Sequence, residues 1–109
     1  MKNQDNLKIG DAVKVKNDIE CPDMKNICIG GWQGRISEII KHPDGGITIG
    51  IKWDSKTLKK MPEKFIESSE KDGLDYASMY LYPDDIIKVQ PRDSIEDVSN
   101  VLKKISKSL

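Results

Sequence analysis

Short stretches in which apolar and polar residues alternate predict that this chain is built mainly from β-strands with one buried face. Residues 12–16 alternate valine with lysine. Residues 47–53 give the clearest strand, because every second position carries a large apolar side chain. These positions are Ile47, Ile49, Ile51 and Trp53. Shorter apolar runs predict two further strands, at residues 79–82 and 86–90.

The stretch 34–40 predicts a strand that is bent by a β-bulge. Its apolar positions, Ile36 and then Ile39 and Ile40, break strict alternation. One extra residue near Ser37 would restore the alternation by turning Ile39 inward. We therefore expect the ladder of hydrogen bonds to shift at this point.

A tight turn separates this strand from the next one. Residues 42–46 have the sequence His-Pro-Asp-Gly-Gly. Proline fixes one backbone angle, and Asp-Gly accepts the positive φ that tight hairpins need. Residues 34–53 are therefore predicted to form one hairpin, whereas residues 17–31 lack a clear period and are expected to form a long loop.

Residues 62–72 predict a short helix inserted between strands. Pro62 suits the first helical turn, where its missing N–H would have no partner, and Gly73 stands where the helix should end. The apolar and small residues on one side of this helix are Phe65, Ile66 and Ser69.

Residues 92–109 predict a C-terminal amphipathic helix. Ser94 and Asp97 have the spacing of a capping box, with Asp in place of the usual Glu. One apolar stripe follows at Ile95, Val98, Leu102, Ile105 and Leu109. We expect the stripe to pack on the sheet, and the alternative is a contact with a second copy of the chain or with a protein partner.

Composition limits the classes of function. The chain has 109 residues, the size of one small domain, and its 18 Lys+Arg balance 18 Asp+Glu. A zero net charge argues against a general polyanion binder. No apolar run approaches the roughly 20 residues of a membrane span. Residues 1–6 are polar, so we expect them to be disordered. They lack the apolar core of a signal peptide, so we expect the protein to be cytoplasmic.

Few residues suit catalysis or a structural zinc site. Cys21, Cys28 and His42 offer three ligands at the wrong spacing for zinc, so we expect the two cysteines to be free thiols. The single histidine leaves no Ser-His-Asp triad, and the Gly-Gly pairs lack the lysine of a phosphate loop. The chain is therefore not expected to be an enzyme.

Several stretches resemble an SH3-like barrel. They are residues 9–15, 31–36 and 51–54. The Gly-x-x-Gly-x-Ile run at 31–36 is similar to the KOW-type strand of that superfamily, in which Gly34 would permit a sharp bend and Ile36 would point into the core. The resemblance implies a mainly β fold: a small SH3-like barrel over residues 7–91, with the helical insertion at 62–72 and the C-terminal helix at 92–109.

A second resemblance covers roughly residues 7–98. The runs 30–36, 53–62 and 73–85 are similar to a family of small bacterial proteins named for a cyanobacterial calcium-binding protein, CcbP. This resemblance implies a non-catalytic protein that binds or buffers calcium on an SH3-like scaffold, without an EF-hand.

The carboxylates suggest where calcium would bind. Calcium takes six to eight oxygen ligands, and the chain has no EF-hand loop to supply them. Acidic residues instead gather at the end of the predicted helix and in the turn before the last strand. The predicted ligands are Glu70, Asp72, Asp75, Asp84 and Asp85. Other candidates are Glu20, Asp23 and Asp54. The alternative is structural: Asp84 would cap the turn after Pro83, Asp54 would cap the segment after Trp53, and the rest would be solvated charges.

Basic and aromatic residues suggest an alternative function, the binding of nucleic acid or of a protein. Lysines occupy outward positions of neighbouring strands, and exposed aromatic rings can stack on bases or line a peptide groove. The residues are Lys14, Lys16, Lys52, Trp32, Tyr80 and Tyr82. The structural alternative is that the lysines keep the sheet edges from pairing. Trp53, at the end of an apolar face, is expected to lie in the core.

Overall fold

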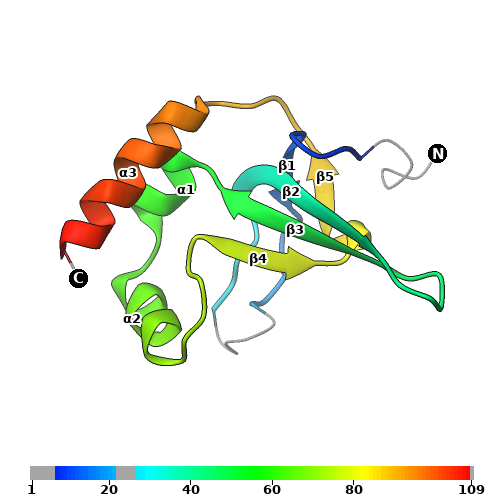
Figure 1. The fold of residues 1–109 in the computed structure, drawn as a ribbon, viewed down its shortest axis with the longest axis horizontal. Coiled ribbons are helices and arrows are strands. Elements are labelled where there is room, and N and C mark those ends of the chain that lie inside the picture. The colour runs from blue at the N-terminus through cyan, green and yellow to red at the C-terminus, as the bar shows by residue number, and fades with distance from the viewer. Residues whose placement is uncertain (1–6, 22–26, 109) are drawn as a thin grey trace.

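The alternating stretches form a single antiparallel sheet. A computed structural model describes residues 7–21 and 27–108. Within these ranges five strands pair in the order β4-β3-β2-β1-β5 (Figure 1). The strands are β1 (Ala12–Val15), β2 (Gln33–Lys41), β3 (Ile47–Trp53), β4 (Ser78–Leu81) and β5 (Ile86–Lys88). The prediction of a mainly β fold with added helices is confirmed, whereas the predictions for residues 1–6, Asp23 and Leu109 concern positions outside the described ranges.

The predicted core face of β3 and the predicted bulge in β2 are both confirmed. Ile49, Ile51 and Trp53 are at most 1% exposed. The β2–β3 register runs from Ile36 opposite Ile51 directly to Glu38 opposite Gly50, which leaves one residue of β2 unpaired. This extra residue is a β-bulge, which bends β2 and restores the inward alternation.

The turn between β2 and β3 closes as its residues predict. The His42 amide donates to the Gly46 carbonyl at 2.8 Å, and the Gly46 amide donates to the Asp44 carboxylate at 2.8 Å. Gly45 has a φ of +92°, which a residue with a side chain rarely adopts. The hairpin projects away from the helices (Figure 1).

The sheet is curled, because its two edge strands are neighbours in sequence. Only Tyr82 and the 3₁₀ turn η2 (Pro83–Asp85) join β4 to β5. A flat sheet of this order would separate its edges by roughly 19 Å, whereas a 3₁₀ turn advances only about 2 Å per residue. The ladders of the described strands do not pair β4 with β5, so the sheet is curved but not closed into a barrel.

Three α-helices in the described ranges gather at one end of the sheet (Figure 1). They are α1 (Ser55–Lys60), α2 (Glu63–Lys71) and α3 (Ile95–Ser108). α2 matches the predicted insertion, with Pro62 before it and Gly73 after it at a φ of +74°. α1 was not predicted as a helix, although Asp54 does cap this segment by accepting a hydrogen bond of 2.8 Å from the Thr57 amide. None of the helices in the described part of the chain is long and apolar enough to cross a bilayer.

The C-terminal helix begins as predicted but faces the core through a different residue. Ser94 and Asp97 exchange backbone-to-side-chain hydrogen bonds of 3.1 Å each, which confirms the capping box. Val101, outside the predicted stripe, is 7% exposed, whereas Ile95, the first residue of that stripe, is 73% exposed. The other stripe members that the structure describes, Val98, Leu102 and Ile105, are partly buried against the core. The prediction that the stripe packs on the rest of the molecule therefore holds for Val98, Leu102 and Ile105 but not for Ile95.

Aromatic side chains join the sheet to α2. The Trp32 ring meets Trp53 and Phe65 edge to face, with centroid distances of 5.3 Å and interplanar angles of 85° in both pairs. Trp32, one of the rings predicted to stack on bases, is thus half-buried against the core. Cys21 is buried and Cys28 is exposed, and both are free thiols, as expected.

Candidate functional site

The structure distributes the predicted calcium ligands over three places. Glu70 lies near the end of α2, with Asp72 as its C-terminal cap, and Asp84 and Asp85 lie in η2. Asp75 holds its own loop, because its two carboxylate oxygens accept hydrogen bonds of 2.9 Å from the Ala77 amide and the Ser78 hydroxyl. Across residues 7–21 and 27–108, no three His, Cys, Asp or Glu side chains come together in a group that could hold a metal ion.

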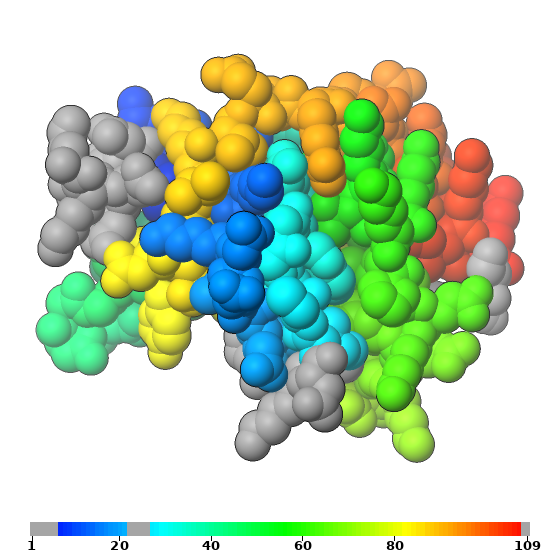
Figure 2. Space-filling model, turned by 180° about the vertical axis from the view of Figure 1, so that it is seen from behind, coloured from blue at the N-terminus to red at the C-terminus, as the bar shows by residue number. Residues whose placement is uncertain are grey.

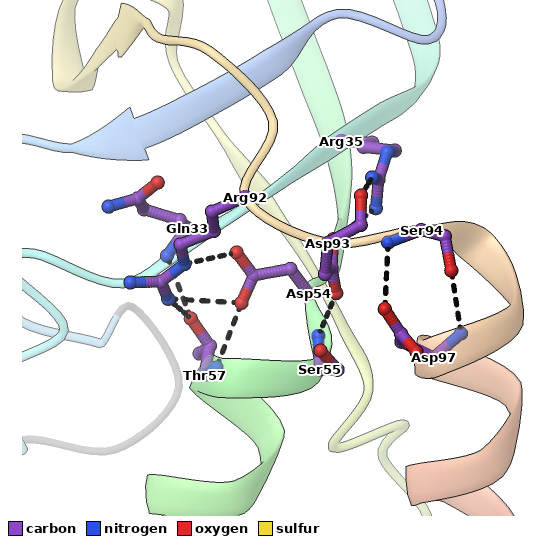
Figure 3. Close-up of polar contacts among 9 residues, drawn as sticks. All are labelled: Gln33, Arg35, Asp54, Ser55, Thr57, Arg92, Asp93, Ser94 and Asp97. Carbon is purple, nitrogen blue, oxygen red and sulfur yellow. Dashed lines mark hydrogen bonds and ion pairs between the residues drawn. The ribbon is translucent and has the colours of Figure 1, made fainter.

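A network of ion pairs around two buried carboxylates lies where the β5–α3 connection meets α1 (Figure 3). The Arg92 guanidinium donates two hydrogen bonds to the Asp54 carboxylate, from Nε to Oδ2 at 2.7 Å and from Nη2 to Oδ1 at 3.0 Å. It also donates to the Thr57 hydroxyl at 3.0 Å. The Gln33 amide donates to the same hydroxyl at 3.0 Å, so β2 joins the network. The bond with Asp54 raises the pKa of Arg92.

A second pair lies beside the first. Arg35 Nη1 is 2.9 Å from Asp93 Oδ1, and the Ser55 amide donates to Asp93 Oδ2 at 2.6 Å. Burial by itself favours the neutral acid, but the hydrogen bonds from Ser55 and Arg35 and the charge of Arg35 outweigh it and lower the pKa of Asp93. In the space-filling view the orange β5–α3 connection lies between the cyan start of β2 and green α1 (Figure 2). The network therefore fastens α3 to the sheet, and its charges are satisfied within the chain.

The predicted lysines lie on different strands of the sheet. Lys14 in β1 lies between Gln33 of β2 and Ile87 of β5, whereas Lys52 lies on β3, opposite Arg35. β2 therefore separates the two lysines, and Arg35 between them is bound to Asp93. Lys16 lies just beyond β1, where its amide donates to the Asp85 carbonyl at 2.9 Å.

Two tyrosines, in contrast, line a hollow of about 270 Å³ at the joint between β4 and β5, which we call the tyrosine pocket. It is lined by Ile19, Glu20, Thr48, Tyr80, Leu81, Tyr82 and Asp85. Tyr80 is 54% exposed and Tyr82 is 69% exposed, although both are large and partly apolar. Exposed aromatic rings at the edge of a pocket with polar groups are typical of binding sites.

Tyr80 is held in place by a glycine and a carboxylate. A Cβ atom at Gly50 would lie 3.0 Å from the Tyr80 ring and 3.1 Å from Glu38 Cβ, so the ring lies over Gly50. The Tyr80 hydroxyl donates to Glu38 Oε1 at 2.8 Å. This hydrogen bond and the negative charge of Glu38 raise the pKa of Tyr80. The ring thus spans from β4 to β2 and presents a fixed face.

The opposite wall of the tyrosine pocket comes from the segment after β1. The Ile29 amide donates to the Ile19 carbonyl at 2.9 Å, and Glu20 pairs with Cys28 in an isolated antiparallel bridge. Ile29 is fully buried and anchors this ribbon in the core. Hydrogen bonding therefore positions both walls before any ligand arrives, as preorganised binding requires.

A larger hollow of about 410 Å³ lies between the helices. Its apolar floor includes Leu58, Met61 and Val101. Its charged border mixes both signs, with Glu63 and Glu67 from α2 and Lys59 and Lys104 from α1 and α3. A border of mixed charge favours neither a cationic nor an anionic ligand, so the tyrosine pocket is the better candidate site.

Three residues of the tyrosine pocket were predicted from the sequence as functional, but as parts of two different sites. Tyr80 and Tyr82 were predicted as stacking rings, and Asp85 as a metal ligand. Ile19 and Thr48 were missed, because no local pattern links residues so far apart in the chain. Comparisons with protein families, with curated proteins and with solved structures find no match to this chain.

Proposed function

We propose that this chain is a non-catalytic protein-binding module that holds an extended peptide segment with a basic side chain in the tyrosine pocket. The observation that carries the proposal is the exposure of Tyr80 and Tyr82 beside two carboxylates, Glu20 and Asp85. The faces of aromatic rings attract cations, and carboxylates form charge-assisted hydrogen bonds with lysine and arginine.

The charges of the pocket favour a basic peptide over nucleic acid. A phosphate backbone would meet the carboxylates of Glu20 and Asp85, while the whole chain offers no excess of basic residues. Nucleic-acid binding at Lys14 and Lys52 is the alternative. A salt-sensitive complex with oligonucleotides that is lost in the double variant Lys14→Glu, Lys52→Glu would favour it.

We infer that the scaffold is an SH3-like barrel in which the β4–β5 edge is left unpaired. The curled sheet supports this, because β1 to β4 follow each other as neighbours and β5 returns to pair with β1. Gly34 supports it as well, because it lies where β2 approaches the backbone of β3 closely. Aromatic grooves on such barrels bind peptides, in keeping with the proposed site.

Titration of the isotope-labelled protein with short blocked peptides tests the binding proposal. We expect Ac-Ala-Arg-Ala-NH₂ to shift the amide resonances of Ile19, Leu81 and Tyr82, and Tyr82→Ala to abolish the shifts. Leu74→Ala, which trims another exposed apolar residue, is the matched control and should leave them unchanged. An equal response to Ac-Ala-Glu-Ala-NH₂, or no response to the arginine peptide, would overturn the proposal.

Calcium binding, which the resemblance to the CcbP family implies, is a second proposal with its support in the sequence alone. Its ligands would come from Glu70, Asp72 and Asp75 or from Asp84 and Asp85. Isothermal titration with calcium chloride, followed by amide shifts, tests it directly. Saturable heat with shifts at these residues would support calcium binding, and the absence of any response at millimolar calcium would exclude it.

A further inference from the structure

The outward face of α3 has the pattern of a helix-pairing seam. Ile95, Ser99, Leu102 and Ser106 are spaced by four, three and four residues, so they lie along one side of the helix. Ile95 is 73% exposed, the two serines are exposed, and Leu102 is half-buried. Val101, which is 7% exposed, lies on the side that faces the core. α3 therefore presents a large apolar side chain to solvent although it already packs on its own molecule.

Charged residues border this seam on one side. Glu96 and Lys103 are seven residues apart, so they occupy equivalent positions two helical turns from each other. They follow Ile95 and Leu102 directly and lie on the same flank of the seam. The flank is thus negative toward the start of α3 and positive toward its end.

We propose that α3 pairs with α3 of a second copy of this chain, antiparallel, about a two-fold axis. The seam is self-complementary in this orientation: Leu102 would lie against Ser99 of the second copy, and Ile95 against Ser106 of the second copy. Each large side chain thus meets a small one, so the two helices approach closely. A two-fold interface makes every such contact twice.

The charges on the flank select this partner and this orientation. The antiparallel register that matches large with small residues also brings Glu96 close to Lys103 of the second copy, and Lys103 close to its Glu96. In a parallel pair about a two-fold axis the charged flanks of the two helices would instead lie on opposite sides of the seam, so Glu96 and Lys103 would not pair across it. The dipoles of antiparallel helices attract each other, and a chain of zero net charge does not repel its copy.

Sedimentation velocity from micromolar to millimolar protein tests the pairing. We expect the wild-type mass to rise toward a dimer with concentration, and Ile95→Asp to raise the dissociation constant by about tenfold or more. Ile9→Asp is the matched control, because Ile9 is also an isoleucine, 67% exposed, and lies outside α3. A wild-type monomer at every concentration, or equal effects of the two variants, would overturn the proposal.

A charge exchange tests the orientation. Glu96→Lys and Lys103→Glu should each weaken the dimer, and the double variant Glu96→Lys, Lys103→Glu should regain it, because the swap restores opposite charges across the axis. Urea midpoints measured at low protein concentration separate these effects from any change in monomer stability. A double variant that dimerises no better than the single variants would contradict the antiparallel pairing.

Discussion

Gly34 stands in β2 where any side chain would meet the backbone of β3. A Cβ atom at this position would lie 2.8 Å from the Ile51 methyl Cγ2 and 2.9 Å from the carbonyl carbon of Lys52. Backbone atoms of a central strand cannot move aside cheaply, because they are fixed by the ladders on both sides. Glycine is therefore required here by space.

We expect Gly34→Ala to lower the free energy of unfolding by about 3 kcal/mol, the upper part of the range for overpacking in a core. Urea denaturation measures this change. Gly46→Ala is the control, because its added methyl group would lie 3.1 Å from a carboxylate oxygen of Asp44 and in ordinary contact, at 3.9 Å, with the His42 ring, and both side chains lie in an exposed turn where they can shift. Equal losses in the two variants would show that the close approach is not the cause.

Asp93 is a carboxylate whose surroundings favour its charged form. Its side chain is only 3% exposed, between the Arg35 guanidinium and the Ser55 amide. Because these partners lower its folded pKa below the unfolded value, Asp93 contributes stability above the unfolded pKa. That contribution disappears as the pH falls through the lowered folded pKa.

The wild-type protein should therefore lose stability as the pH falls below about 4, where free aspartate becomes protonated. Asp93→Asn should be less stable than wild type at neutral pH by about 1–3 kcal/mol, with a smaller further loss between neutral and acid pH. Urea unfolding at a series of pH values measures both curves. Parallel curves for the two proteins would contradict the assigned role of Asp93.

At the scale of elements, two ion pairs of very different burial can be compared. In the first pair Asp54, whose side chain is 5% exposed, binds Arg92, whose side chain is 31% exposed, and joins the β5–α3 connection to α1. In the second pair Lys88, 51% exposed, reaches Asp11, 20% exposed, at 3.4 Å. Removing the partner of a buried charge is costly, while exposed pairs contribute little.

We expect Arg92→Met to lower the free energy of unfolding by about 3 kcal/mol, because Asp54 would stay buried without its partner. Lys88→Met is the matched control and should change it by less than about 1 kcal/mol. Thermal or urea unfolding of the two variants gives the comparison. A loss in Lys88→Met as large as that in Arg92→Met would contradict the role of burial.

Elements whose signals are local could be predicted from the sequence. The inward face of β3, the bulge at Ser37, the turn at 42–46 and the Ser94 capping box each depend on residues within a few positions of one another. α1 was missed as a helix because it has only six residues, too few to show an apolar repeat. Its one signal, Asp54 as a cap, was interpreted correctly without the helix that follows.

Features that depend on distant residues could not be predicted. Asp54 and Arg92 are 38 positions apart, and no pattern in either segment points to the other. The same holds for the tyrosine pocket, which needs the curled sheet to bring Ile19 near Tyr82. The helix stripe failed in part for a related reason: periodicity shows that Ile95 shares a side with Leu102, but not how far the body of the protein extends beneath it.

At the scale of the whole molecule, the central strands of the sheet are more deeply buried than the C-terminal helix α3. β2 and β3 pair over most of their length and carry several fully buried residues, whereas among the side chains of α3 that the structure describes Val101 alone is fully within the core. α3 is also held by Val98, Leu102 and Ile105, which are only partly buried against the core, and by the Arg92 and Asp93 contacts that precede it.

Opening free energies should therefore differ between the two ends. Native-state hydrogen exchange is expected to show α3 amides opening at lower free energy than those of β2 and β3, since regions with few buried contacts open first. The dimer proposed above would raise protection in α3 with concentration, so the measurement belongs at low protein concentration. Amides of α3 that open only with the sheet would contradict this order.

The two tryptophans of the chain have a consequence for how the protein can be observed. Trp32 and Trp53 meet nearly at right angles between the sheet and α2. Indole transitions held this close and at a fixed angle couple to each other, so the pair acts as a built-in chiroptical reporter. The circular dichroism of the coupled indoles reports on the packing between the sheet and α2 without any added label. This signal would weaken as soon as that packing loosens.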